Sequence, residues 1–256
     1  MEIIALFIIG LFIGSFLKVL AERLPKGKTV LWGRSHCDHC LQTLRWFELI
    51  PLFSFMVQHG RCRRCLTRLS WQYPLVEFST GVMFALIGYG HTPILSTPVS
   101  LLSLGAALLL ASSLLVIFIS DFKYQIIPDS MVIAGITGLL LLHGALNFQF
   151  LTGQHFFSAL GAAGFFFTLY LVTGGRGLGL GDVKLGALLG LWLGYPKTVT
   201  AIYVAFLTGA IAGVILILAK RKTMKSKVAL GPFLIGGALV ANLWGENIVQ
   251  LWQQFL

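Results

Sequence analysis

Charged side chains are scarce in this sequence. Lys, Arg, Asp and Glu together make up 11% of its 256 residues, and only nine residues are acidic. A soluble globular domain carries about 25% charged residues, so the composition excludes that class. Hydrophobic residues make up 57%, and the mean hydropathy is +0.86. The sequence therefore predicts an integral membrane protein.

Apolar segments recur along the chain. A helix needs roughly 20 residues to cross about 30 Å of hydrocarbon. Eight such spans are predicted, at residues 3–20, 74–89, 100–119, 130–146, 156–173, 183–194, 198–219 and 231–251. The sixth would rise only about 18 Å as a helix, so one of its ends should meet water or a thinned bilayer. The expected fold is an all-α polytopic membrane protein with about eight transmembrane helices.

Basic residues are unevenly distributed between the loops. The segment 18–68 contains ten of the 19, and the loop 220–227 contains five. The others on the same side are Lys123, Arg176 and Lys184, which leaves Lys197 opposite. Because cytosolic loops retain positive charge, these loops are predicted to be cytosolic and both termini to lie outside. Topology and anionic lipid headgroups account for the positive charge, so no nucleic-acid partner is expected. The first helix precedes its basic residues, which favours a retained helix over a signal peptide.

All four cysteines lie in one polar insertion, residues 21–73, between the first two spans. Cys37-x-x-Cys40 and Cys62-x-x-Cys65 have the spacing of tetrahedral zinc sites, and a reducing cytosol makes disulfides the weaker alternative. A subdomain this small buries little surface, so a structural zinc ion is expected, with a redox or catalytic metal as the alternative. The predicted division is a first transmembrane helix at 1–20, a cytosolic zinc-binding subdomain at 21–73 and a membrane domain at 74–256.

Three of the nine acids, Asp121, Asp129 and Asp182, lie at ends of apolar segments on the predicted cytosolic side. Acids in such places are candidates for function. Two carboxyl groups in one leaflet suit an aspartic peptidase, in which one ionised and one protonated acid activate a water molecule. In GLGLGDVKLG, the glycines that include Gly179 and Gly181 would let a helix or a substrate backbone approach Asp182. The residues alone do not choose between Asp121 and Asp129 as its partner.

Each acid also has a structural interpretation. Asp129 follows Pro128 and is typical of a helix N-cap, Asp182 could cap its helix or pair with Lys184, and Asp121 could pair with Lys123. The Gly-x-Gly pattern does not indicate nucleotide binding, because that fingerprint needs a βαβ unit. A proton-coupled transporter is the alternative from another class.

Several motifs in the same order resemble the bacterial type IV prepilin peptidases, which are intramembrane aspartic peptidases of the Gly-x-Gly-Asp type. The first three are GSFLKVLAERLP at 14–25, the two cysteine motifs on either side of LRWFELIPLFSF, and GRCRRCLTRLSWQYPLVEFSTG at 60–81. The other two are DFKYQIIPD at 121–129 and GLGLGDVKLG at 177–186. The similarity covers nearly the whole chain.

The resemblance implies cleavage of basic leader peptides from prepilins or pseudopilins at the cytosolic face of the bacterial inner membrane. It implies that Asp121 and Asp182 are the catalytic pair, rather than Asp129. Gly179, Gly181 and Lys184 would support the active site. Prepilins, the lipid bilayer and components of pilus or secretion assembly are the implied partners.

Many members of this family also methylate the new N-terminal residue with S-adenosylmethionine. Glu22 and Glu77 are the candidate contacts for this cofactor, although Glu77 could instead anchor the second span through neighbouring arginines. This chain departs from the family pattern at Lys18, where Asn is usual. A peptidase without methyltransferase activity, whose zinc subdomain is a docking platform, is therefore the alternative.

Overall fold

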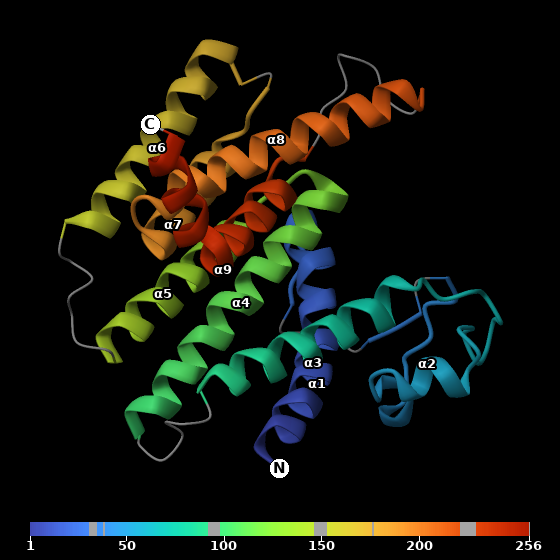
Figure 1. The fold of residues 1–256 in the computed structure, drawn as a ribbon. Helices are drawn as coiled ribbons and strands as arrows, with labels where there is room; N and C mark the ends of the chain where they lie inside the picture. The colour runs from blue at the N-terminus through green and yellow to red at the C-terminus, as the bar shows by residue number, and fades with distance from the viewer. Residues whose placement is uncertain are drawn as a thin grey trace. The chain divides into compact units, whose positions relative to one another are not determined.

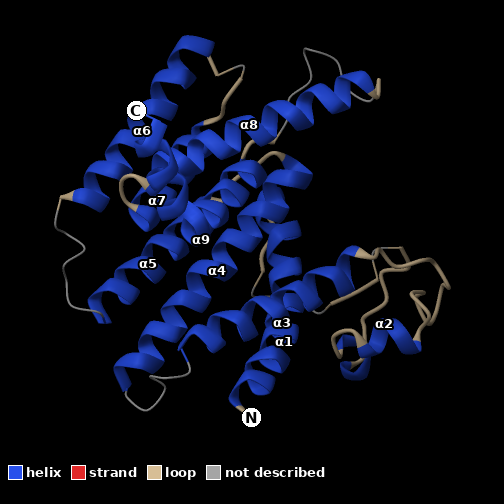
Figure 2. Ribbon diagram, in the orientation of Figure 1, coloured by secondary structure: helices blue, strands red, loops and turns tan. Residues whose placement is uncertain are grey.

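The computed structural model describes residues 1–30, 35–37, 39–91, 98–145, 153–175, 177–220 and 229–255. Helices dominate these residues (Figure 2). The extended pairing found among them consists of two isolated antiparallel bridges, His36 with Thr43 and Arg61 with Arg68. The all-α prediction is confirmed for this part of the chain. Arg176 and the basic loop at 221–227 lie outside the described residues.

Each of the eight predicted apolar segments overlaps one long helix. These helices are α1 (Glu2–Arg23), α3 (Gln72–His91), α4 (Pro98–Tyr124), α5 (Asp129–Ala145), α6 (Gln154–Thr173), α7 (Leu180–Leu193), α8 (Lys197–Leu218) and α9 (Gly231–Phe255). Between α1 and α3 lie the short elements η1 (Leu24–Lys26), η2 (Trp46–Leu49) and α2 (Phe53–Val57). Four of the described helices, α1, α4, α6 and α8, are long and apolar enough to cross a membrane. The count of eight spans stays a prediction.

Two helix ends differ from the apolar segments in a way that matters for the acids. Helix α4 continues to Tyr124, past the predicted end at 119, and α7 begins at Leu180 rather than 183. Hydropathy falls at the first charged residue, whereas helical hydrogen bonding continues until the backbone changes direction, here at Gln125 with φ 55°. Asp121 is therefore in the last turn of α4, and Asp182 is in the first turn of α7.

The chain divides into two compact units, Met1–Ser112 and Ser113–Leu256. In the first unit α1 packs against α3 (Figure 1). Small residues let the two backbones approach closely: a Cβ atom at Gly10 would lie 2.8 Å from Gly81 Cα, and one at Gly14 would lie 2.9 Å from Glu77 Cα. This is the packing that small residues permit between membrane helices. The predicted division of the chain after residues 20 and 73 concerns which segments lie in the membrane and which in the cytosol. It stays a prediction.

In the second unit α6 pairs with α7, and α8 pairs with α9. Helix α7 also contacts α5, α8 and α9, and it buries Leu185, Leu188 and Leu189. A helix that packs against four others faces protein over much of its surface, so its length need not match the bilayer. This explains how a helix of 14 residues fits among longer ones.

The close approach of α1 and α3 can be tested with one methyl group. Gly14→Ala should lower the free energy of unfolding by about 1–3 kcal/mol, because the new Cβ atom meets the backbone of α3. Gly90→Ala is the matched control, since a Cβ atom there has open space. Thermal unfolding in detergent micelles measures both, and equal stability of the two variants would contradict the packing.

Candidate active site and metal centre

A cavity of about 350 Å³ lies where α4 ends and α5, α7 and α9 begin. Its lining includes both predicted catalytic acids, Asp121 and Asp182, although they are far apart in the chain. The charge of Asp182 acts on Asp121 across this space. The remaining lining residues are Gln125, Ile126, Ile127, Asp129, Gly175, Gly177, Leu178, Gly179, Gly181, Lys184, Ala229 and Leu230. The structure thus brings the two acids into one cavity.

Asp121 is held by the start of α9. Its side chain is 5% exposed, and its Oδ2 atom accepts a hydrogen bond from the N–H of Gly231 at 2.8 Å. A Cβ atom at position 231 would lie 2.6 Å from the same oxygen, so the contact requires glycine. Sequence reasoning placed Gly231 only at the start of a span. The signal that could have marked it is the Gly-Pro pair at the head of an apolar helix.

Asp182 is held in a related way by its own helix. Its Oδ2 atom accepts a hydrogen bond from the N–H of Gly179 at 2.9 Å, directly before α7. A carboxylate in this position caps one of the unpaired amides of the first helical turn. The predicted capping role of Asp182 is therefore fulfilled by one of its two carboxyl oxygens, Oδ2. Among the described residues, the side chains of Asp121 and Asp182 each accept one hydrogen bond, and in both cases the donor is a glycine N–H.

Lys184 pairs with Asp129, from the first turn of α5, with Nζ and Oδ1 2.7 Å apart. Both side chains are exposed and line the cavity. Lys184 therefore joins α7 to α5, and the predicted alternative of an ion pair with Asp182 is wrong. Lys123 lies against the ring of Tyr124, and Asp121 pairs instead with the Gly231 amide.

The glycines beside Asp182 have different roles. At Gly181 a Cβ atom would lie 3.1 Å from Ile127 Cβ, so this position admits the segment that precedes α5. Gly179 supplies an N–H donor, and a Cβ atom there would meet only ordinary contacts. The contact at Gly181 is with a side chain of that segment, and the predicted approach of a helix or a substrate backbone stays a prediction.

The four cysteines form a compact cluster. The Sγ atoms of Cys37, Cys40, Cys62 and Cys65 all lie within 4.8 Å of one another, and none is in a disulfide. Cys37 Sγ and Cys65 Sγ are 3.9 Å apart. Tetrahedral zinc with Zn–S bonds of about 2.3 Å requires sulfur atoms about 3.8 Å apart. The cluster therefore fits a zinc ion.

The two cysteine motifs repeat one backbone structure. In the first, the N–H of Cys37 donates to Gln42 O and that of Leu41 to Cys37 O. In the second, the N–H of Cys62 donates to Thr67 O and that of Leu66 to Cys62 O. The leucine after each motif has a positive φ, 55° and 57°. Each turn directs two thiols towards the same point.

Thr67 contacts one of the four thiols, that of Cys65. A hydrogen bond of 3.3 Å joins Cys65 Sγ and the Thr67 hydroxyl, and interactions with Thr67 lower the pKa of Cys65 to about 6. Metals bind the thiolate rather than the thiol.

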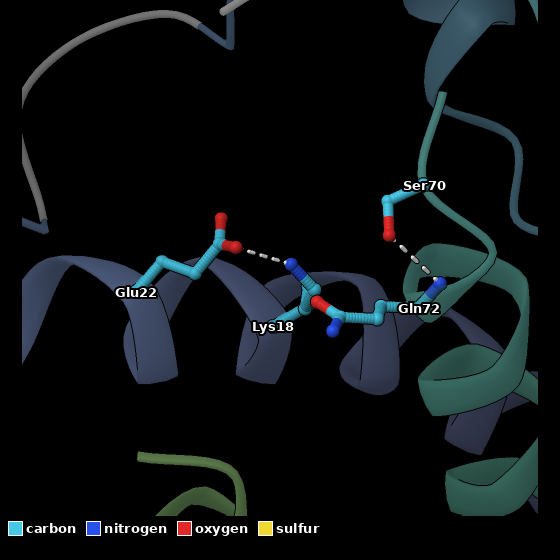
Figure 3. A network of polar contacts seen from close by, with 4 residues as sticks. All are labelled: Lys18, Glu22, Ser70 and Gln72. Carbon is cyan, nitrogen blue, oxygen red and sulfur yellow. Dashed lines mark hydrogen bonds and ion pairs between the residues drawn. The ribbon is translucent and has the colours of Figure 1, made fainter. Parts of the chain in front are cut away.

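The predicted cofactor residues Glu22 and Glu77 lie in the first unit and have partners within the chain. Glu22 forms an ion pair with Lys18, which is 1% exposed and lies 4.2 Å from the centre of the Tyr73 ring. Figure 3 shows this pair beside Gln72, whose N–H donates to the Ser70 hydroxyl.

Glu77 is buried, and its Oε2 atom accepts the N–H of Leu52 at 2.9 Å. The sequence suggested that Glu77 could anchor its helix through neighbouring arginines. The partner observed for Glu77 is instead the backbone amide of Leu52. Glu22 and Glu77 thus contact Lys18 and the Leu52 amide, respectively.

Comparisons with known proteins match both units. The model of the Bacterial Peptidase A24 N-terminal domain matches residues 8–90, and that of the Type IV leader peptidase family matches residues 108–217. A protein of Pseudomonas aeruginosa is 31% identical, over 97% of this chain and 92% of its own length. One of Bacillus subtilis is 32% identical over 96% of both chains, and one of Dickeya chrysanthemi is 33% identical over 95% and 94%. All three are named prepilin leader peptidase/N-methyltransferase. No solved structure matches this chain.

The fold and these sites define a helical membrane protein with two aspartates in one cavity and a separate four-cysteine cluster. The family models and the full-length relatives indicate one family. The chain belongs to the type IV leader peptidase family. The resemblance carried by the sequence motifs is confirmed.

The cysteine cluster should hold about one zinc ion per chain, as four converging thiolates require. Elemental analysis of the purified protein measures the content, and Cys62→Ser should lose most of it. His39→Ala is the control, since His39 is outside the cluster. Retention of zinc by Cys62→Ser would contradict the assignment.

Proposed function

We propose that this protein is a membrane aspartic endopeptidase that removes leader peptides from type IV prepilins or pseudopilins. The observation that carries the proposal is the presence of Asp121 and Asp182 in one cavity. Family membership supports the substrate class, because relatives of nearly full length are named prepilin leader peptidases. It also favours proteolysis over proton-coupled transport.

In the proposed mechanism Asp121 and Asp182 share one proton. Two neighbouring carboxyl groups do not both ionise readily, because their negative charges repel each other. The ionised acid takes a proton from a water molecule, whose oxygen attacks the scissile carbonyl carbon. The protonated acid donates its hydrogen bond, and then its proton, to the carbonyl oxygen. Collapse of the tetrahedral intermediate breaks the C–N bond, and the leaving nitrogen takes a proton from the acid pair.

The two glycine amides support this chemistry. Each binds one oxygen of a catalytic carboxyl group, which fixes the orientation of that group without contacting the substrate. Correct orientation of catalytic groups is worth several kcal/mol of the activation barrier. Gly231 is therefore proposed as a positioning residue, together with Gly179. Gly181 and the Lys184–Asp129 pair shape the cavity around the acids.

A second activity, N-methylation of the new N-terminal residue, is proposed from the names of the relatives. S-adenosylmethionine would supply the methyl group. Glu22 remains the candidate contact on α1, since it is only partly buried, whereas Glu77 is buried against Leu52. Lys18 departs from the usual Asn, but its charge is matched by Glu22, so the departure does not leave an unpaired buried cation. The cysteine cluster fits a structural zinc ion, which would hold the two cysteine motifs together.

The proposed location is the bacterial inner membrane, with the acid pair on the cytosolic side. Four helices long enough to cross a membrane support the membrane location. The distribution of basic residues supports the orientation, with both termini outside.

Leader removal can be measured by the mass of the product from a purified prepilin. Asp121→Asn and Asp182→Asn should each lower kcat about a thousandfold or more, because the amide can neither accept nor release the proton. Glu246→Gln is the matched control, an acid-to-amide change at the Lys197 ion pair. A loss as deep in Asp129→Asn as in Asp121→Asn would contradict the choice of partner.

The same spectrum tests the second activity. With S-adenosylmethionine present, the cleaved product of the wild-type protein should carry the mass of one added methyl group. A product that is cleaved but never methylated would retain the peptidase proposal and reject the methyltransferase.

Three glycines of α9 test the positioning of Asp121. Gly231→Ala should lower kcat about tenfold or more with little change in KM, since the new Cβ atom displaces a catalytic carboxyl group. Gly236→Ala, where a Cβ atom has open space, should change neither constant. Gly237→Ala would overlap the backbone oxygen of Ala201 and should lower thermal stability. The Gly231 amide does not position Asp121 if Gly231→Ala leaves kcat unchanged, as in Gly236→Ala, or if it lowers thermal stability, as in Gly237→Ala.

A further inference from the structure

The segment between η1 and α3, called the cysteine module, presents large apolar side chains outward. Five of them come from η2 and α2 and are between 41% and 78% exposed: Trp46, Leu49, Phe53, Met56 and Val57. Phe53, Met56 and Val57 have i, i+3, i+4 spacing and so share one face of α2. Water is an unfavourable environment for such a surface. The module therefore needs an apolar partner on this side.

The position of α2 along α3 indicates that partner. The N–H of Leu52, directly before α2, donates to Glu77, which is in the second turn of α3. Ser15, well inside α1, also interacts with this carboxyl group. Each helical residue rises 1.5 Å, so Leu52 lies about 8 Å inside the start of α3. The chain thus folds back from the end of α1 and runs beside the membrane helices.

Measured from residue 74, where the predicted span begins, Glu77 lies about 5 Å along the helix, a position that suits a membrane interface. Amphipathic helices at a bilayer surface bury their apolar face about 5–10 Å into the boundary between headgroups and acyl chains. The hydrogen bond between Leu52 and Glu77 holds the start of α2 at a comparable depth. Tryptophan, as at Trp46, is enriched at the same level of membrane proteins.

Basic side chains accompany the apolar residues in the cysteine module. Arg45 precedes Trp46, and the second cysteine motif carries Arg61, Arg63, Arg64 and Arg68, all exposed. The guanidinium of Arg63 lies 5.5 Å from the centre of the Phe47 ring, within η2. Basic side chains beside an inserted apolar face attract anionic lipid headgroups. The positive charge of these arginines is thus complementary to a surface of anionic lipids and not to a basic protein.

We infer that the apolar face of η2 and α2 inserts into the lipid interface where α1 ends and α3 begins, with the arginines of the module on anionic phospholipid headgroups. The cysteine module is then a membrane-embedded platform rather than a domain free in the aqueous phase. Glu77 sets its depth, and the metal cluster fixes its internal structure. The inference does not depend on the proposed peptidase or methyltransferase activity.

A photo-crosslinker tests the inference in the full-length protein. With p-benzoylphenylalanine in place of Met56, in nanodiscs of phosphatidylethanolamine and phosphatidylglycerol, illumination should give adducts with the mass of a phospholipid. The same group in place of Gln42, an exposed polar residue of the first cysteine motif, should give about tenfold fewer. The group in place of Phe12, exposed on α1, gives the yield expected for lipid contact.

A charge introduced on the face provides the second measurement. With the crosslinker in place of Val57, Met56→Glu should reduce the lipid adduct several-fold, whereas Gln42→Glu should leave it unchanged. Lipid yields at position 56 no higher than at position 42 would overturn the inference. Crosslinks from position 56 to protein instead of lipid would also overturn it and would indicate a protein partner.

Discussion

A backbone amide that reaches a buried carboxyl group is the constraint on which the candidate active site depends. Asp121 is almost fully buried, and a buried polar group needs a hydrogen-bond partner. Gly231 supplies one from the first residue of α9, and it can do so because it lacks a side chain. This contact joins the end of α4 to the start of α9. The cavity that contains Asp182 lies beside the same junction.

The same physical rule shapes the first unit. Lys18 is buried, and Glu22, one turn further along α1, matches its charge. Glu77 is buried, and the amide of Leu52 donates a hydrogen bond to it. In both units, a charged side chain among membrane helices thus connects a helix to another part of the structure. The small residues of α1 and α3 allow the close packing that brings these groups together.

Much of the local structure could be predicted because its signals are local. Long apolar segments predict helices, and all eight segments overlap one. The two Cys-x-x-Cys motifs predict a metal cluster, because each motif directs two thiols from a single turn. The predicted helix ends were less accurate, because hydropathy does not indicate where the helical backbone hydrogen bonds stop. Of the alternative ion pairs, Lys184 with Asp182 was wrong, because neighbours in sequence at i and i+2 point in different directions on a helix. The partner of Lys184 is Asp129, 55 residues away.

The sequence by itself determined the class of protein, the approximate helices, the cysteine cluster and the family, because these follow from composition, periodicity and short motifs. Only the tertiary structure decided which groups meet. Gly231 meets Asp121 across 110 residues, and Leu52 meets Glu77 across 25. In each of these contacts the donor is a backbone amide, which every residue except proline possesses. No side chain marks such a donor in the sequence, so only the packing of the helices reveals it.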